Sequence, residues 1–307
     1  MDIEKIHPEL QQAFRRIPPL PFHNRLFVNS MNFLIGLAPG KKEIDGVIIS
    51  KKTLTNAGLR IYQPNGDSSG AGLLWIHGGG MITGRATQDD QTCANYARDL
   101  NLVVVSVDYR LAPKHPFPVP LDDCYEVWQW FTHEADNLGV DPSRIAISGQ
   151  SAGGCLAASL AQKILDAGGV QPAAQALFCP MLDDRTAADP ALDAIKHRVW
   201  NNKSNRAGWS AYLGHSPGES DVPAYAAPAR RDELAGLPPT WVGIGDIDLF
   251  YEEARLYAQR LNEANVNCQF HTVPMAPHAF ETFVPRASIT QDFYQDNYQF
   301  LQEALSL

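Results

Sequence analysis

The sequence has no long hydrophobic run and only five cysteines among its 307 residues. No stretch approaches the roughly 18 consecutive apolar residues of a membrane-spanning helix. The first residues lack the apolar segment of a signal peptide, so we expect a cytoplasmic protein. The cysteines are scattered, odd in number and without Cys-x-x-Cys spacing: Cys93, Cys124, Cys155, Cys179 and Cys268. Neither a disulfide framework nor a zinc site is therefore expected. We expect the cysteines to be buried free thiols instead.

Basic residues are also scarce. The chain has 25 Lys and Arg against 34 Asp and Glu, which gives a formal net charge of −9, and the basic residues are dispersed. A nucleic-acid surface needs a basic patch or stripe, so no nucleic-acid partner is expected. The chain has no internal repeat and no low-complexity tract.

Strand-like and helix-like segments alternate along most of the chain. Strands are predicted near residues 59–62, 73–77, 102–108, 145–148, 176–179, 241–245 and 267–273. Helices are predicted near residues 88–99, 121–137, 151–167, 249–264 and 288–304. Such alternation predicts an α/β fold, in which helices cover both faces of a mostly parallel sheet. The functional site of such a sheet lies beyond the carboxyl ends of its strands.

One pentapeptide has the form Gly-x-Ser-x-Gly: Gly149, Gln150, Ser151, Ala152 and Gly153. It follows a predicted buried strand and precedes a run of small residues that is typical of a helix packed closely on a sheet. At such a strand-to-helix junction a serine can occupy a strained turn that exposes its hydroxyl. The flanking glycines leave room for the neighbouring backbone. Ser151 is therefore the candidate nucleophile.

A triple-glycine segment, His77-Gly78-Gly79-Gly80, follows the predicted strand at 73–77. Consecutive glycines allow backbone N–H groups to turn toward a single oxygen, which is how an oxyanion hole forms without side-chain donors. The N–H of Ala152, at the start of the helix after Ser151, is expected to supply a further donor.

The chain also supplies a candidate base and a candidate acid in the appropriate order. His278 lies in a proline-bounded loop after the last predicted strand, whereas His271 lies within that strand and is expected to be a sheet-surface residue. Asp246 and Asp248 both follow the predicted strand at 241–245. Either carboxylate could instead cap the following helix, and local sequence alone leaves the choice between them open.

Together these motifs resemble the hormone-sensitive-lipase family of esterases, which have the α/β-hydrolase fold. The matching stretches are residues 77–80, 108–113, 149–154, 248 onward and 277–278. The resemblance implies a catalytic triad of Ser151, Asp248 and His278. It implies that the oxyanion donors are the N–H groups of Gly78, Gly79 and Ala152. It selects Asp248 over Asp246 and implies no metal and no organic cofactor.

Two positions depart from the family pattern. Gln150 stands where the family usually has an acidic residue or a threonine, so a charge beside the nucleophile is absent and the pH dependence is expected to differ. Ala279 stands where the family usually has glycine after the histidine. If that position needs a positive φ, alanine costs about 1 kcal/mol there.

Two regions interrupt the alternation. Residues 1–45 are proline-rich at first and then amphipathic, and residues 182–225 separate two predicted strands. Long insertions in a compact domain usually cover a functional site or are disordered, and the aromatic content argues against disorder. By the family likeness, these segments form a helical cap. Residues 46–181 and 226–307 then form the catalytic α/β-hydrolase domain.

These observations predict a serine carboxylesterase that acts on small-molecule esters with short to medium acyl chains. Two alternatives stay open: the same machinery acting on lactones, amides, carbonates or sugar acetates, and a ligand-binding relative without catalysis. The strand near 267–273 is expected at a sheet edge, where it can pair with a second copy to form a homodimer.

Overall fold

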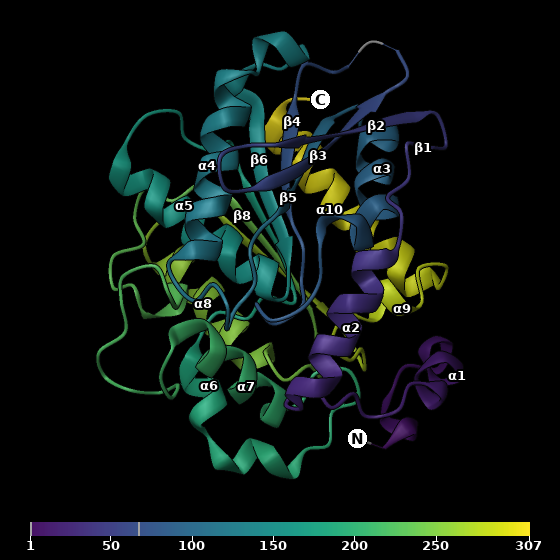
Figure 1. The fold of residues 1–307 in the computed structure, drawn as a ribbon, viewed down its shortest axis with the longest axis vertical. Coiled ribbons are helices and arrows are strands. Elements are labelled where there is room, and N and C mark those ends of the chain that lie inside the picture. Colours follow the sequence, from purple (N-terminus) through teal and green to yellow (C-terminus); the bar gives the residue numbers. More distant parts are fainter. Residues whose placement is uncertain (1, 67) are drawn as a thin grey trace.

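The computed structural model describes residues 2–66 and 68–307 (Figure 1). Within these residues, nine strands form one sheet in the order β1-β2-β3-β5-β4-β6-β7-β8-β9. The strands are β1 (Glu43–Ile44), β2 (Val47–Thr53), β3 (Gly58–Pro64), β4 (Gly72–Ile76), β5 (Val103–Asp108), β6 (Ile145–Gln150), β7 (Gln175–Phe178), β8 (Thr240–Gly245) and β9 (Cys268–Val273). All seven predicted strands are present, and β9 closes the order at one edge as expected.

The sheet is parallel from β5 to β9 and antiparallel from β1 to β3, with β3 also antiparallel to β5. The central strands β4, β6, β7 and β8 are buried along their whole length. Burial on both faces is what parallel strands require, because helices cover each side. The mostly parallel sheet that the sequence predicts is therefore confirmed.

Helices cover both faces of this sheet. They are α1 (Pro8–Arg16), α2 (Arg25–Leu37), α3 (Asp90–Asp99), α4 (Val119–His133), α5 (Ala152–Ala167), α6 (Asp184–Ala188), α7 (Asn202–Leu213), α8 (Tyr251–Glu263), α9 (Phe280–Phe283) and α10 (Ser288–Leu305). Buried residues of α4, α5 and α8 share one core with Leu74 and Ile76. Buried residues of α1, α3 and α10 share the other with Leu73 and Trp75, the alternate residues of the same strand.

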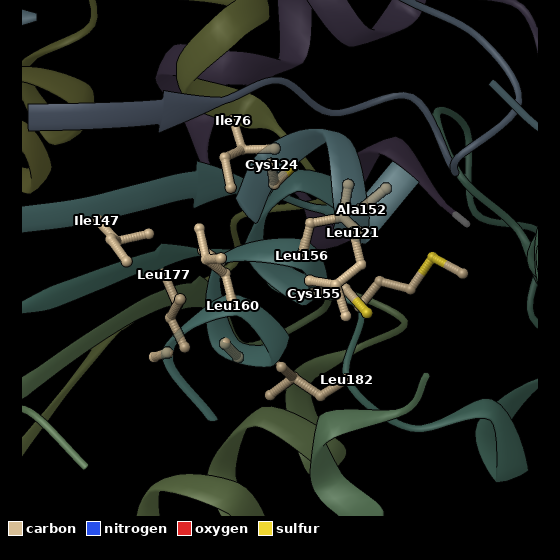
Figure 2. Packing of buried hydrophobic residues seen from close by; sticks show 14 of the residues in the cluster. Ile76, Leu121, Cys124, Ile147, Ala152, Cys155, Leu156, Leu160, Leu177 and Leu182 are labelled. Atoms are coloured by element: carbon tan, nitrogen blue, oxygen red, sulfur yellow. The ribbon is translucent and has the colours of Figure 1, made fainter. Parts of the chain in front are cut away.

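The helix α5 lies directly against the centre of the sheet. Leu156 and Leu160 pack near Ile147 and Leu177, which project from β6 and β7 (Figure 2). A β-carbon on Gly153, in the first turn of this helix, would overlap the carbonyl oxygen of Ile76 in β4. The small residues of α5 are thus what allows the helix, and the residue before it, to lie so close to the strand ends.

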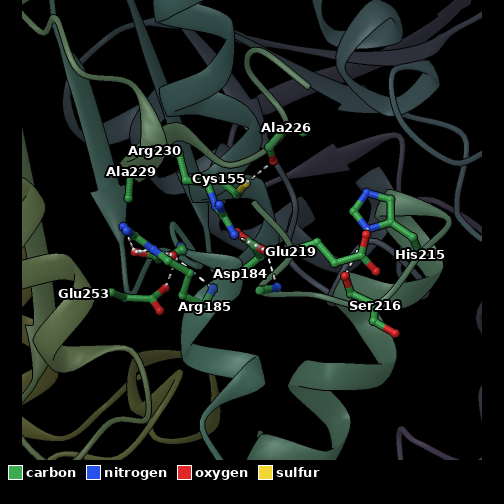
Figure 3. A network of polar contacts seen from close by, with 12 residues as sticks. Cys155, Asp184, Arg185, His215, Ser216, Glu219, Ala226, Ala229, Arg230 and Glu253 are labelled. Atoms are coloured by element: carbon green, nitrogen blue, oxygen red, sulfur yellow. Dashed lines mark hydrogen bonds and ion pairs between the residues drawn. The ribbon is translucent and has the colours of Figure 1, made fainter. Parts of the chain in front are cut away.

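The two segments expected to form a cap lie together at one end of the molecule, where α1, α2, α6 and α7 gather (Figure 1). A buried polar network fixes the inserted segment in place (Figure 3). The fully buried carboxylate of Asp184 accepts hydrogen bonds from Arg230 Nε and Nη2 at 2.6 and 2.9 Å and from Gly218 N at 2.6 Å. Glu253 of α8 accepts the backbone N–H of Leu182 at 2.6 Å.

Across the described residues, every helix is too short or too polar to cross a membrane. The five cysteines are all buried as free thiols.

Candidate active site

Ser151 occupies a sharp turn between β6 and α5. Its φ of 56° and ψ of −116° lie in a region that residues with a side chain rarely adopt, and such backbone conformations cost about 1–3 kcal/mol. The turn is held because Ser151 N donates to Phe178 O at 2.8 Å and Cys155 N donates to Ser151 O at 3.1 Å. The serine therefore sits at the junction that the sequence predicts, in the strained geometry expected of a nucleophile.

A histidine and a carboxylate complete a hydrogen-bonded chain with this serine. His278 Nε2 lies 3.0 Å from Ser151 Oγ, and His278 Nδ1 lies 2.7 Å from Asp248 Oδ2. Asp248 Oδ1 accepts the backbone N–H of Phe250 at 3.0 Å, which fixes the carboxylate. His278 follows β9 and Asp248 follows β8, so both reach the serine from the carboxyl ends of neighbouring strands. The structure brings these three predicted residues together.

The surroundings of His278 favour its role as a general base. Burial lowers the pKa of His278, but the charge of Asp248 and its hydrogen bond outweigh burial, so the net pKa is raised. A carboxylate accepts only, so Nδ1 carries the proton and Nε2 is left with a lone pair toward the serine hydroxyl.

The other acid and the other histidine have different partners. Asp246 Oδ1 accepts the backbone N–H of Met275 at 2.6 Å and so shapes the loop that leads to His278. His271 lies in β9 at the surface, with its Nδ1 3.0 Å from a carboxylate oxygen of Asp296. Neither Asp246 nor His271 belongs to the row of hydrogen bonds that joins Asp248, His278 and Ser151.

The triple-glycine loop passes directly over the serine turn. A β-carbon on Gly78 would lie 3.5 Å from Ser151 Cβ, so the backbone of Gly78 and the serine are in contact distance. Gly79 has a φ of +123°, and a β-carbon there would overlap the carbonyl oxygen of Thr83. Only glycine fits this turn, which directs the backbone across the site. Ala152, the first residue of α5, has no intrahelical acceptor for its N–H.

His77 stabilises the loop from below. Its buried ring stacks on Tyr109 with centroids 4.1 Å apart, and its Nδ1–H donates to Gly78 O at 2.8 Å. The Tyr109 hydroxyl donates to His77 O at 3.0 Å. The carbonyl oxygens of residues 77 and 78 are thus both engaged by side chains of the loop and its neighbour. His77 is thus a support of the loop.

Three residues near the histidine were not identified from the sequence. Gln150 Nε2 donates to Glu281 Oε1 at 2.6 Å and to Thr282 Oγ1 at 2.7 Å, which links the serine turn to α9. Cys179, just after β7, places its thiol beside Asp248 and His278. Nothing in the local sequence pattern around Glu281, Thr282 or Cys179 indicates these contacts. Ala279, whose φ is 55°, does adopt the positive φ that the family glycine suggested.

Among the described residues, the thiol, carboxylate and imidazole of Cys179, Asp248 and His278 place one ligand atom each within 4.8 Å of the others. Zinc accepts such a donor set. However, burial raises the pKa of the Cys179 thiol well above its usual value, and Asp248 and His278 direct their ligand atoms at each other. The arrangement favours proton transfer to Ser151 over metal binding.

Two cavities lie near the site, and the smaller of them includes a residue of the Ser151–His278–Asp248 chain in its wall. The larger, about 990 Å³, lies between α2 and residues 108–115 and is lined by Val28, Asn32, Ile82 and Tyr109. The smaller, about 650 Å³, has Asp248 in its wall and is lined by the apolar side chains of Ile195, Ile247 and Leu249. Both are of a size that holds a small organic ligand.

Known proteins share this fold. Residues 73–282 match a family described by the alpha/beta hydrolase fold. Esterase LipI of Mycobacterium tuberculosis is 32% identical over 277 residues, which cover 88% of this chain and 80% of LipI. Carboxylesterase NlhH of the same species is 34% identical over 245 residues, which cover 76% of this chain and 75% of NlhH. A solved bacterial heroin esterase is 33% identical and covers 99% of both chains with a TM-score of 0.90. The chain therefore belongs to the α/β-hydrolase family, as a carboxylic ester hydrolase of the hormone-sensitive-lipase type that its motifs predict.

Proposed function

We propose that the protein is a serine carboxylesterase in which Ser151, His278 and Asp248 form the catalytic triad. His278 takes the proton of Ser151 as the serine oxygen attacks the ester carbonyl carbon. The imidazolium then donates this proton to the alcohol oxygen as the bond between that oxygen and the carbonyl carbon breaks, so the alcohol leaves and an acyl-enzyme remains. Asp248 holds the imidazole in the required tautomer and stabilises its cation. Water then releases the acyl group by the same steps in reverse. The hydrogen-bonded chain from Asp248 Oδ2 through His278 to Ser151 Oγ carries this proposal.

The developing oxyanion is stabilised by the N–H groups of Gly78, Gly79 and Ala152. This part of the proposal is supported by the passage of Gly78 over Ser151 and by the position of Ala152 at the start of α5. A helix N-terminus also carries a partial positive charge, which favours an anion at that point. One such donor is worth about 3–4 kcal/mol in the transition state.

The experiment that tests the proposal is covalent labelling. A fluorophosphonate probe should label the wild-type protein at Ser151 and leave Ser151→Ala unlabelled. The variant should keep the wild-type thermal unfolding curve and lose ester turnover by about 10⁴-fold or more. Undiminished ester hydrolysis by Ser151→Ala would contradict the assignment of the nucleophile.

The segments 1–45 and 182–225 form the cap in this proposal, and residues 46–181 and 226–307 form the catalytic domain. Two contacts support the cap. Asn32 Nδ2 of α2 donates to Ile82 O at 2.9 Å in the loop after the glycines, and Arg198 Nη1 donates to Ile17 O at 3.1 Å between the two cap segments. The sheet itself begins at Glu43, so the last residues of the first segment pair with β2.

We further infer that short to medium acyl esters are the substrates and that the larger cavity receives one arm of the ester. A relative from Pseudomonas putida is named ethyl acetate hydrolase, which supports a short acyl chain. Val28, buried in the wall of this cavity, gives the test. Val28→Trp should shift the preference in an acyl-chain-length series toward shorter chains. Leu26→Trp on the exposed side of the same helix should leave the preference unchanged.

A second candidate activity is amide hydrolysis by the same triad. A relative from Oryctolagus cuniculus, 29% identical over 79% of this chain, is named arylacetamide deacetylase. Matched aryl esters and aryl amides distinguish the two activities, because the leaving group changes while the acyl group stays the same. A rate of amide hydrolysis that equals or exceeds the rate of ester hydrolysis would favour amide hydrolysis as the activity of the protein.

Dimerisation and a cytoplasmic location complete the proposal. The strand β9 lies at an edge of the sheet, a position that supports a homodimer through this strand. Light scattering on the purified protein tests it. A Pro substitution at Thr272 of β9, whose N–H faces away from β8 in this register, should dissociate the dimer if this edge forms it.

A further inference from the structure

The residue before the nucleophile makes a buried contact with the residue three positions after the catalytic histidine. Gln150 Nε2 donates to Glu281 Oε1 at 2.6 Å. Gln150 is 9% exposed and Glu281 2% exposed. Since Gln150 adjoins Ser151 and Glu281 lies at the end of the turn that begins at His278, one short hydrogen bond connects the two loops whose separation sets the distance from Ser151 Oγ to His278 Nε2.

Glu281 is also a buried acid in a site that must hold a cation. The titratable groups that interact with it come from several elements: Asp248 after β8, His278 on its own loop, Cys179 after β7 with its Sγ 3.9 Å from Glu281 Oε1, the buried carboxylate of Asp89 just before α3, Tyr96 of α3 and Tyr294 of α10. Burial raises the pKa of Glu281, while the hydrogen bond from Gln150 lowers it. The negative charge of Glu281 in turn helps to raise the pKa of His278.

We propose that Glu281 is a positioning residue: through Gln150 it fixes the serine turn against the histidine loop, and its carboxylate adds a second negative charge beside the imidazolium of His278. This inference rests on the proposed triad. Asp248 binds His278 directly, whereas Glu281 acts through Gln150 and through the electric field. An uncharged amide at 150 and a carboxylate at 281 are complementary, since the amide donates and the carboxylate accepts.

The test exchanges the two groups. Glu281→Gln keeps the shape and removes the charge, and kcat should fall ten-fold or more while KM changes less than three-fold. The acid limb of kcat/KM should move to lower pH, because the imidazolium loses a stabilising charge. Gln150→Glu places two carboxyl groups together and should also lower kcat. The double variant Gln150→Glu/Glu281→Gln restores one donor and one carboxylate, and it should recover most of the loss.

A matched control is available in the chain. Gln259 donates to Glu263 at 2.8 Å on the exposed face of α8, so Glu263→Gln breaks an equivalent pair away from the site and should leave kcat unchanged. If Glu281→Gln does not fold, Gln150→Met replaces it. This variant keeps the Glu281 carboxylate and removes the amide that donates to it, and it too should lower kcat while KM changes little. Wild-type kcat and pH profile in the folded variant, or a double variant no better than the single ones, would overturn the proposal. Failure of the triad itself would show separately, as a wild-type protein that the fluorophosphonate does not label.

A different observation concerns His197 in the inserted segment. The residue is 6% exposed, and neither ring nitrogen has a hydrogen-bond partner among the described residues. It lines the 650 Å³ cavity that has Asp248 in its wall, and the charges of Asp248 and His278 both act on it. Leaving a buried donor or acceptor unsatisfied costs about 1–3 kcal/mol, so an imidazole in this position calls for a partner from outside the chain.

We infer that this cavity binds the arm of an ester that carries a second oxygen, such as a ketone or hydroxyl, and that His197 forms the hydrogen bond to that oxygen. Ile195, Ile247 and Leu249 offer an apolar wall to the carbon chain, and charged side chains such as Lys5, Asp246 and Glu252 also line the cavity. His197 is the buried polar side chain of this lining whose ring nitrogens have no partner among the described residues, so it can fix the orientation of the chain. This inference also rests on the proposed esterase function. It predicts a higher kcat/KM for esters with an oxygen-bearing chain than for plain alkyl esters.

Matched pairs of esters test this inference. Ethyl 4-oxopentanoate against ethyl pentanoate places a ketone on the acyl arm, and 3-oxobutyl acetate against butyl acetate places it on the alcohol arm. In one of the two pairs the wild type should prefer the oxo ester by ten-fold or more in kcat/KM, and His197→Phe should abolish that preference by lowering kcat/KM on the oxo ester far more than on the plain ester. His215→Phe, at the surface of the same segment, is the control. The absence of a His197-dependent preference in both pairs would overturn the inference, and the rates on the plain esters would still report the esterase function.

Discussion

Trp200 of the inserted segment packs on Gly80 of the triple-glycine loop so closely that a β-carbon on Gly80 would overlap the outer edge of the indole ring. The indole is buried, and its centroid lies 5.3 Å from that of Phe22 in the first cap segment. Both cap segments and the loop over Ser151 therefore meet at a single point. The position of the loop backbone depends on how the cap packs.

This contact predicts a loss of activity in Gly80→Ala. Alanine would meet the indole, and it would also need the φ of +61° that glycine adopts there. Displacement of the loop removes oxyanion donors from the serine, so kcat should fall about 10²-fold or more. Gly80→Ala/Trp200→Ala removes the clash and should recover part of the loss in a steady-state assay. A single variant with wild-type kcat would show that the loop can move without harm.

The acid of the triad can be assigned by comparing two amide variants. Asp248→Asn should lower kcat by about 10³–10⁴-fold, because an amide group can hold the wrong imidazole tautomer. Asp246→Asn should have a far smaller effect, since Asp246 accepts a backbone N–H from Met275 and does not touch the imidazole. Steady-state kinetics of both variants decide between them. A loss confined to Asp246→Asn would reverse the assignment.

Much of this site is predictable because its residues lie in local patterns. The turn at Ser151 needs glycines at fixed neighbouring positions, and the segments after β8 and β9 carry the acid and the histidine at strand ends. The topology of a parallel sheet then brings these ends together. By contrast, the contact between Gln150 and Glu281 joins residues 131 positions apart and has no local pattern.

Two elements whose bounds the strand and helix patterns did not give, β2 and α2, have weak patterns for physical reasons. The strand β2 lies near an antiparallel edge, where Lys51 and Lys52 are exposed and the apolar alternation ends after Ile49. The helix α2 exposes Leu26 and Phe33, which are 77% and 68% accessible, so its apolar residues do not form one inward stripe. Periodicity identifies elements that bury a single face, and neither of these does so.

The pH dependence of activity should report the environment of His278. Its imidazole must be neutral to accept the serine proton, and its net pKa is raised by Asp248 despite the opposing effect of burial. Because a raised pKa keeps the imidazolium to higher pH, kcat/KM should fall as the pH drops through a value above the ordinary 6.5. In Asp248→Asn the residual activity should show an acid limb at lower pH. A limb below 6.5 in the wild type would contradict the electrostatic argument.

The stability of the cap should depend on the ion pair of Asp184 and Arg230. The Asp184 carboxylate is fully buried, and Arg230 is 19% exposed at its side chain. Removing one member of a buried pair leaves an uncompensated charge and costs about 3–5 kcal/mol. Asp184→Asn also weakens the acceptor for Gly218 N, so denaturant unfolding should show a loss of about 3 kcal/mol.

The matched control is the exposed pair of Glu252 and Arg255 on α8, which are 65% and 39% accessible at their side chains. Exposed pairs contribute about 0–1 kcal/mol, so Glu252→Gln should change the free energy of unfolding by less than 1 kcal/mol. If the two variants lose the same amount, the network in Figure 3 does not anchor the inserted segment. If Asp184→Asn instead unfolds the cap alone, the unfolding curve should show two transitions. Ester turnover should then fall before the sheet melts, because Trp200, which packs on Gly80 of the triple-glycine loop, belongs to the part that opens first.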